Sequence, residues 1–100
     1  MNLTDFRVYQ LSCQLYRECE ALKAPTHLRS QLSRASSSIA LNIGEGWGRR
    51  THADQRNFFT IAYGSTKEVQ TILTLLGHAP QAQELADHVA ACLYKLTRMR

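Results

Sequence analysis

Three glycines at every second position, followed by two arginines, stand in residues 42–50, NIGEGWGRR. Glycine-rich segments beside cations cradle phosphate groups in nucleotide-binding loops when a strand precedes the glycines and a helix follows them. Here the apolar spacing before the glycines is helical, and a helix C-terminus presents carbonyl oxygens that repel phosphate. The Gly-Lys-Ser/Thr ending of a Walker A loop is also absent. The stretch therefore predicts a helix end and not a nucleotide cradle.

Two interpretations of this helix end stay open. In the first, Gly46 or Gly48 supplies a left-handed residue that stops the helix, and Arg49 and Arg50 compensate its negative pole. In the second, the first N–H groups of a following helix, which begins at Thr51, join the two guanidinium groups in binding an anion or a phosphate backbone. Both interpretations predict a corner between two helices.

Other side chains that could do chemistry lack the partners that the chemistry requires. Glu45 and Glu68 have no nucleophile or histidine at a matching spacing, so we expect them to form ion pairs with arginine or lysine. Ser36, Ser37 and Ser38 lack the glycines of a nucleophile elbow and indicate packing of small side chains. The three cysteines and four histidines do not have metal-ligand spacing. The sequence predicts no enzyme, no metal and no cofactor.

Helical periodicity runs through the whole chain. Apolar residues recur at spacings of three and four and predict α-helices over residues 4–23, 27–46, 52–76 and 80–98. One hundred residues with short connections fit a single domain over 1–100. We therefore expect an all-α fold, an antiparallel up-down-up-down four-helix bundle.

The helix boundaries have recognisable signals. Thr4 or Asp5 can cap the first helix, and Pro25 ends it, with Thr26 as the next N-cap. Thr51 begins a segment of capping-box form, and Gly77 is placed to end the third helix. Small side chains on the second and third helices predict a close crossing between them.

Polar residues lie on the predicted seam between the second and third helices. Asn42 falls in the apolar stripe of the second helix, and Ser65 in that of the third, which also includes Phe58. Because a buried amide requires partners, we expect Asn42 to bond Ser65 or the backbone beside Gly64. Gly64 itself predicts close contact with a neighbour, since glycine is unfavourable inside a helix. The interhelix residues predicted are Ser38, Asn42, Glu45, Gly46, Gly64, Ser65 and Glu68.

The chain is mildly basic, with 12 Lys and Arg against 8 Asp and Glu and a net charge of +4. This charge permits a polyanionic partner without requiring one. The candidate nucleic-acid contacts are Arg29, Arg34, Arg49, Arg50, Arg56, Lys95 and Arg98. Aromatic residues are not interleaved with these charges along the sequence, which argues against stacking of single strands. We expect neither a membrane span nor a secretory signal, and hence a cytoplasmic protein.

Two groups of apolar residues are not explained by a single buried stripe on each helix. Residues 72–76 place apolar side chains around more than one face of the third helix, which indicates a second interface and oligomerisation. Trp47 follows the second helix and predicts a plug for the end of the bundle or a contact between subunits.

The segment QLSRASSSIALNIGEGWGRRTHADQRNFFTIAYGSTKEVQTIL resembles the four-helix-bundle protein family, some of whose members are encoded in intervening sequences of 23S ribosomal RNA genes. A related member is the accessory protein of diversity-generating retroelements. The residues that match the family pattern are Gln31, Arg34, Ala35, Ser38, Ile39, Asn42, Ile43, Glu45, Gly46, Arg49 or Arg50, Phe58 or Phe59, Ala62, Gly64, Ser65 and Glu68. Gly44 and Ser33 depart from it, and Ser33 removes one arginine from a basic pair.

The resemblance implies an antiparallel four-helix bundle that assembles as a homopentamer and acts as a nucleic-acid-binding accessory protein without catalytic activity. Our first functional hypothesis is accordingly an oligomer that contacts RNA or DNA backbones through Arg49, Arg50 and their neighbours. The second is an assembly factor that docks a protein partner, such as a polymerase, without contacting nucleic acid.

Overall fold

The computed structural model describes residues 1–98 and is all-α over that range, with four α-helices and no strand. A short 3-10 turn, η1 (Leu3–Asp5), precedes them. The helices are α1 (Arg7–Ala21), α2 (Thr26–Trp47), α3 (His52–Leu76) and α4 (Pro80–Arg98).

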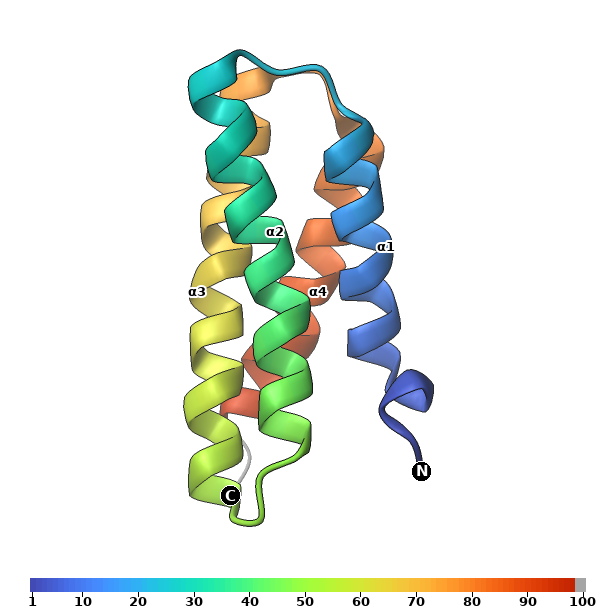
Figure 1. Cartoon of the computed structure of the whole chain (residues 1–100), viewed down its shortest axis with the longest axis vertical. Helices are drawn as coiled ribbons and strands as arrows, with labels where there is room; N and C mark the ends of the chain where they lie inside the picture. The colour runs from blue at the N-terminus through green and yellow to red at the C-terminus, as the bar shows by residue number, and fades with distance from the viewer. Residues whose placement is uncertain (99–100) are drawn as a thin grey trace.

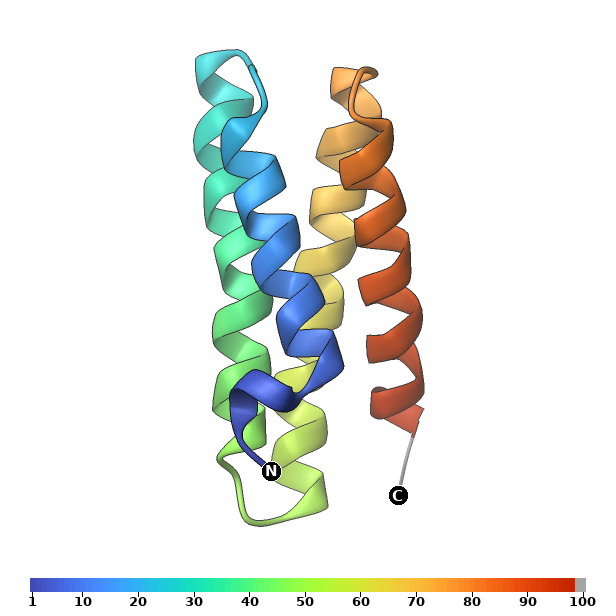
Figure 2. The same cartoon turned by 90° about the vertical axis from the view of Figure 1, so that its right-hand side faces the viewer.

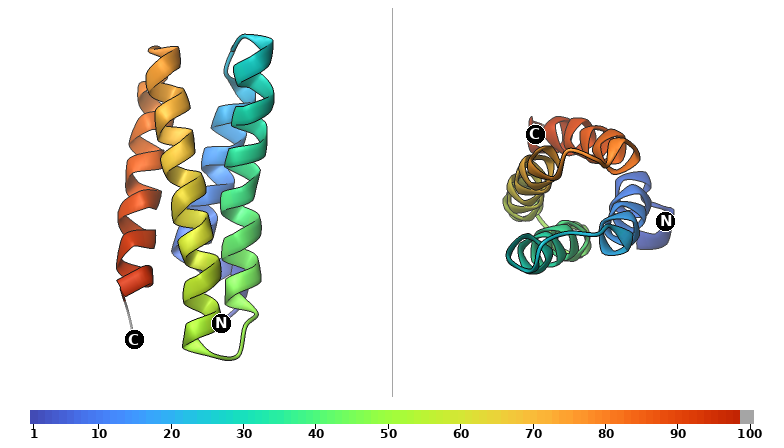
Figure 3. Two further views of the ribbon diagram at one scale, coloured as in Figure 1. Left: turned by 90° about the vertical axis from the view of Figure 1, so that its left-hand side faces the viewer. Right: turned by 90° about the horizontal axis from the view of Figure 1, so that it is seen from above.

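The helices lie side by side around one core, in the order α1, α2, α3, α4 (Figure 3). The α1–α2 and α3–α4 connections lie at one end of the molecule (Figure 1). The α2–α3 connection, the N-terminus and the C-terminal end of α4 lie at the other (Figure 2). This arrangement brings residues near 50 and residues near 95 to the same end of a bundle 40 Å long.

The core follows the predicted stripes on α1 and α2 and departs from the prediction on α3. Phe59 and Thr66 are buried on α3, whereas Phe58 and Ser65, which were expected in the stripe, are only half-buried. Thr66 can enter the core because its hydroxyl donates to the Ala62 carbonyl at 2.8 Å. The fully buried larger apolar side chains are Leu15, Leu32, Ile39, Ile43, Leu73, Leu93, Val69, Val89 and Cys19.

Gly46 explains why Phe59 occupies the core. A Cβ atom at position 46 would lie 2.8 Å from Cε1 of Phe59 and 3.1 Å from Cβ of Phe58. Glycine therefore lets the Phe59 ring pack against the α2 backbone, in keeping with the expected close crossing of α2 and α3. The prediction for Gly64 is wrong: a Cβ there would meet nothing within 4 Å, and the residue is exposed.

The first helix begins later than predicted. Phe6 has an extended backbone, with φ −76° and ψ 114°, which separates η1 from α1, and no side chain caps α1. The Phe6 ring instead packs 5.0 Å from the Trp47 ring and 6.2 Å from the Phe59 ring. These aromatic contacts at the end of the bundle override helix propensity, and they place half-buried Trp47 where an end plug was expected.

The later boundaries are close to the sequence signals. Thr51 caps α3, its hydroxyl accepting from the Asp54 N–H at 3.1 Å. Gly77 ends α3 with φ 74°, as predicted. Thr26 is the first residue of α2 and Pro25 occupies the cap position, one residue earlier than expected.

The expectation of a left-handed glycine at the end of α2 is wrong. Gly48 has φ −81° and ψ −4°, and Gly46 lies inside the helix. The last turn of α2 instead tightens without a change of hand, because the Gly48 N–H donates to the Glu45 carbonyl at 3.2 Å and the Arg49 N–H to the Gly46 carbonyl at 3.1 Å, each three residues earlier.

None of the helices in residues 1–98 combines the length and the apolar character needed to cross a bilayer. Over the same residues, His, Cys, Asp and Glu side chains do not gather in groups of three or more that could hold a metal ion. All three cysteines are free, and burial raises the pKa of the Cys19 thiol to about 11.

Candidate nucleic-acid interface

Five of the predicted cationic residues lie at one end of the bundle. Arg49 and Arg50 stand in the α2–α3 connection, Arg56 follows in the second turn of α3, and Lys95 and Arg98 lie in the last turn of α4. The α2–α3 connection and the end of α4 share that end of the molecule (Figure 2). We call these five residues the basic end.

Arg49 is held in place but stays accessible. Its guanidinium Nη2 lies 3.2 Å from Oε2 of Glu45, one helical turn earlier, and its Cζ lies 4.6 Å from the centre of the Phe58 ring. The ion pair between Arg49 and Glu45 agrees with the structural role predicted for that carboxylate. Because both side chains are well exposed, at 43% and 56%, this pair is weak in water and can exchange for a phosphate.

The remaining members of the basic end surround the junction of α3 and α4. Arg50 is exposed. Arg56 is half-buried and lines a small hollow with Phe59 of α3 and with Leu96 of α4. Lys95 is exposed, and the Arg98 guanidinium stacks over the Tyr94 ring, with 4.4 Å between Cζ and the ring centre.

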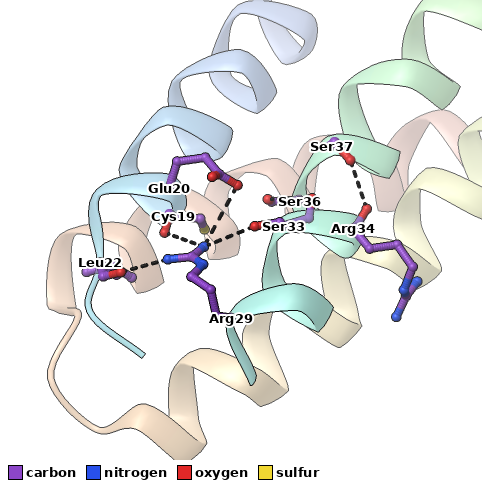
Figure 4. A network of polar contacts seen from close by, with 8 residues as sticks. All are labelled: Cys19, Glu20, Leu22, Arg29, Ser33, Arg34, Ser36 and Ser37. Carbon is purple, nitrogen blue, oxygen red and sulfur yellow. Dashed lines mark hydrogen bonds and ion pairs between the residues drawn. The ribbon is translucent and has the colours of Figure 1, made fainter. Parts of the chain in front are cut away.

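Arg29 and Arg34 lie apart from the basic end, nearer the start of α2. Arg29 is half-buried and donates to the carbonyl oxygens of Leu22 at 2.7 Å and Cys19 at 2.9 Å, as Figure 4 shows. These carbonyls lie at the C-terminal end of α1, and the last turn of that helix has no basic residue of its own. Arg29 thus links α2 to the end of α1 and neutralises the negative pole of that helix.

Arg34 is bonded across the α2–α3 seam to Glu68 of α3. Its side chain is 62% exposed and that of Glu68 37%, so the pair lies at the surface. The contact agrees with the structural ion pairing predicted for Glu68.

Replacing Arg29 by methionine is expected to lower the free energy of unfolding by about 1.5 kcal/mol, because two part-buried carbonyls lose a charged donor. Arg34→Met is the matched control on the same helix, with an expected loss of about 0.5 kcal/mol for an exposed ion pair. Urea denaturation measures both values. Equal losses in the two variants would contradict the role assigned to Arg29.

The polar seam between α2 and α3 differs in one contact from the prediction. The Asn42 side-chain amide donates to the carbonyl and the hydroxyl of Ser38, at 2.8 and 3.0 Å, rather than to Ser65 or the backbone near Gly64. The Ser38 and Ser65 hydroxyls lie 2.9 Å apart and form the bridge between the helices. Asn42 orients Ser38 because a residue four positions along a helix returns to the same face.

The fold also brings aromatic residues into contact with cations, which corrects the sequence argument against interleaving. The Tyr63 and Tyr94 ring centres are 6.1 Å apart, on α3 and α4, and the Lys67 amine lies 5.3 Å from the Tyr63 ring centre. The Tyr63–Lys67 and Tyr94–Arg98 pairs are each four residues apart, and this spacing was the available signal. The pairing of the two tyrosines depends on how α3 and α4 pack, which local spacing does not encode.

The molecule is therefore a helical-bundle protein with a basic end. Residues 4–99 match the model of the family described as 23S rRNA-intervening sequence protein. The chain belongs to this family, in agreement with the resemblance noted from its sequence. Comparison with curated proteins finds no match to the chain.

Proposed function

We propose that this chain is a non-enzymatic, cytoplasmic nucleic-acid-binding protein that contacts RNA or DNA backbones through its basic end. The observation that carries the proposal is the convergence of Arg49, Arg50, Arg56, Lys95 and Arg98, from the α2–α3 connection and from α3 and α4, onto one end of the bundle (Figure 2). Membership of a family described by its link to 23S ribosomal RNA genes is consistent with this function.

Electrostatic balance at this end supports the proposal. The acidic residues near it are Asp5, Glu45 and Asp54; the Asp5 carboxylate accepts from the Asn2 N–H, and Glu45 pairs with Arg49. Cations therefore outnumber acids among the described residues there, with Arg7 at the start of α1 adding one more. The opposite end carries Glu18, Glu20 and Glu84, and the Glu20 carboxylate lies 3.8 Å from the Arg29 guanidinium. A polyanion is attracted to the end at which positive charge is in excess.

Binding of a fluorescein-labelled duplex across a salt series tests this function. We expect binding at about 50 mM salt that weakens steeply by 200 mM, because each phosphate contact releases counterions and contributes about −0.9 to the slope of log K against log salt. Fluorescence polarisation measures the slope. Failure to bind duplex or single strands at 50 mM would exclude backbone recognition.

We further propose that the chain forms a homo-oligomer through the outer face of α2 and α3, with the homopentamer implied by family resemblance as the expected assembly. Leu41 follows Arg34 by seven residues, and Ile61 and Leu75 flank Glu68 by seven, so all three share the face of the Arg34–Glu68 pair. Leu41 is 71% exposed, Ile61 51% and Leu75 67%. Exposed apolar side chains on one face are typical of protein contacts.

The same apolar face would also suit the alternative function, docking of a different protein such as a polymerase. Light scattering separates the two uses. A multimer that dissociates on Leu41→Glu substitution supports self-association, whereas a monomeric wild-type protein would favour the protein-partner alternative.

A further inference from the structure

A groove runs between the outer edges of α3 and α4 and has a volume of about 380 Å³. Two tyrosines line it, Tyr63 from α3 and Tyr94 from α4, with ring centres 6.1 Å apart and ring planes inclined by 51°. Tyr94 is 45% exposed and Tyr63 is half-buried. Both rings therefore lie at the surface, whereas the Phe6 ring packs against the rings of Trp47 and Phe59 at the end of the bundle.

Cations accompany both rings. The Lys67 amine lies 5.3 Å from the Tyr63 ring centre, and the Arg98 guanidinium carbon lies 4.4 Å from the Tyr94 ring centre. Lys95 lines the same groove. The single carboxylate in the lining, that of Asp87, accepts a hydrogen bond from the Gln70 side chain at 2.8 Å. The groove is therefore aromatic and positive in the part nearer the end of α4, where Tyr63, Tyr94 and Lys95 line it.

A second groove of the bundle has the opposite character. It lies between α1 and α4, has a volume of about 340 Å³, and is lined by Glu18 and Glu84 without lysine or arginine. The two grooves have similar size and share α4, so their different linings distinguish one as complementary to a polyanion.

We propose that the α3–α4 groove binds unpaired nucleotides, with bases stacked on Tyr94 and Tyr63 and phosphates contacted by Lys67, Lys95 and Arg98. This inference rests on the proposed nucleic-acid function and names its ligand as single-stranded nucleic acid. A stacked base needs an accessible ring face with cations beside it, and this arrangement is found in proteins that bind single strands. Bases inside a duplex already stack on their neighbours and are not available to the rings.

The cations that now lie over the rings do not obstruct this use. Lys67 and Arg98 have long flexible side chains on the surface, and a cation over an exposed aromatic ring is held only weakly. When a nucleotide enters, each side chain can swing from its ring to a phosphate. The ring face is then free for the base.

The test compares Tyr94→Leu with wild type, using fluorescein-labelled dT12, U12 and a dA12·dT12 duplex at about 50 mM salt. Affinity for both single strands is expected to fall about tenfold, because loss of one base–aromatic stack has an effect of this order. Affinity for the duplex is expected to stay within about twofold. Tyr94→Phe keeps the ring and should retain single-strand affinity. Tyr16→Leu, at a tyrosine of α1 that is 36% exposed, is the matched control and should bind all three ligands like wild type.

Three results would overturn the inference and leave the proposed function standing. These are unchanged single-strand affinity in Tyr94→Leu, an equal loss for duplex and single strands, and a loss confined to U12 or to dT12. The last result would mean recognition of the sugar 2′-OH or of the thymine methyl group, because these two groups distinguish U12 from dT12, instead of stacking on the base. If wild type binds neither duplex nor single strands, the proposed function fails together with the inference. Circular dichroism of each variant confirms that the helical fold is intact.

Discussion

Substitution of Gly46 by leucine is expected to lower the free energy of unfolding by about 3 kcal/mol, the upper part of the range for overpacked cores. A Cβ atom at this position would approach the Phe59 ring to 2.8 Å. The ring cannot retreat easily, because Phe59 is 6% exposed and its other side meets Phe6. The larger leucine side chain must therefore separate α2 from α3 or displace Phe59 from the core.

The matched control is Gly64→Leu on the facing helix. Position 64 is exposed, a Cβ atom added there would have no neighbour within 4 Å, and leucine is a better helix former than glycine. We expect this variant to equal wild type or to exceed it by up to about 1 kcal/mol. Urea denaturation gives both values. Similar stability losses in the two variants would contradict the assignment of the close helix crossing to Gly46.

Reversal of two charges at the basic end is expected to have the largest effect on function. In the variant Arg49→Glu/Arg50→Glu, each attraction to phosphate becomes a repulsion, so we expect duplex affinity at about 50 mM salt to fall about 100-fold, or about 2.7 kcal/mol. The slope of log K against log salt should flatten by about 2, since two phosphate contacts are lost. Fluorescence polarisation at several salt concentrations measures affinity and slope together.

A second double variant tests whether binding depends on where the positive charges lie or only on the net charge of the chain. Arg17→Glu/Lys23→Glu changes the net charge of the chain by the same amount, at two exposed residues near the C-terminal end of α1. This variant should lose affinity by less than about fivefold, because salt screens charges more than about 10 Å from a bound phosphate. If the two double variants weaken binding equally, the net charge of the chain governs binding, and the basic end has no special role.

The helices could be predicted closely from sequence because their boundaries depend on local chemistry. Gly77 adopts the left-handed conformation that ends α3, and the Thr51 hydroxyl caps its start. Signals of this kind act over a few residues, so they survive without knowledge of the tertiary structure. The beginning of α1 was mispredicted because Phe6 leaves the helix to contact Trp47, a residue distant in sequence.

The core face of α3 shows the same dependence on distant residues. Phe58 and Phe59 are neighbouring residues of the same type, so a shift of the apolar stripe by one residue is enough to change which of them is predicted to be buried. Gly46 on the neighbouring helix decides between them, because it leaves room for the Phe59 ring. The predictions for Gly48 and Gly64 failed for a related reason. Gly48 has a right-handed backbone and Gly64 has no close neighbour, because the presence of a glycine does not show whether the fold uses its conformational freedom or its lack of a side chain.

The sequence predicted which cationic residues could form the candidate site, but it did not predict which of them would lie together in the fold. Arg29 and Arg49 look alike in sequence, yet one donates to the carbonyls at the end of α1 and the other stays at the surface beside Glu45. Which arginine meets a helix terminus depends on packing. The Tyr63–Tyr94 pair likewise exists only because α3 and α4 lie side by side.

The most direct measurement of where nucleic acid binds is chemical-shift mapping of ¹⁵N-labelled protein during titration with a short duplex at low salt. The largest changes are expected in the amides of residues 48–58 and 94–98, while those of residues 17–29 and 77–85 stay nearly constant. Strongest changes in the second group, or no changes at all at saturating duplex, would contradict the proposal that the basic end binds the nucleic-acid backbone.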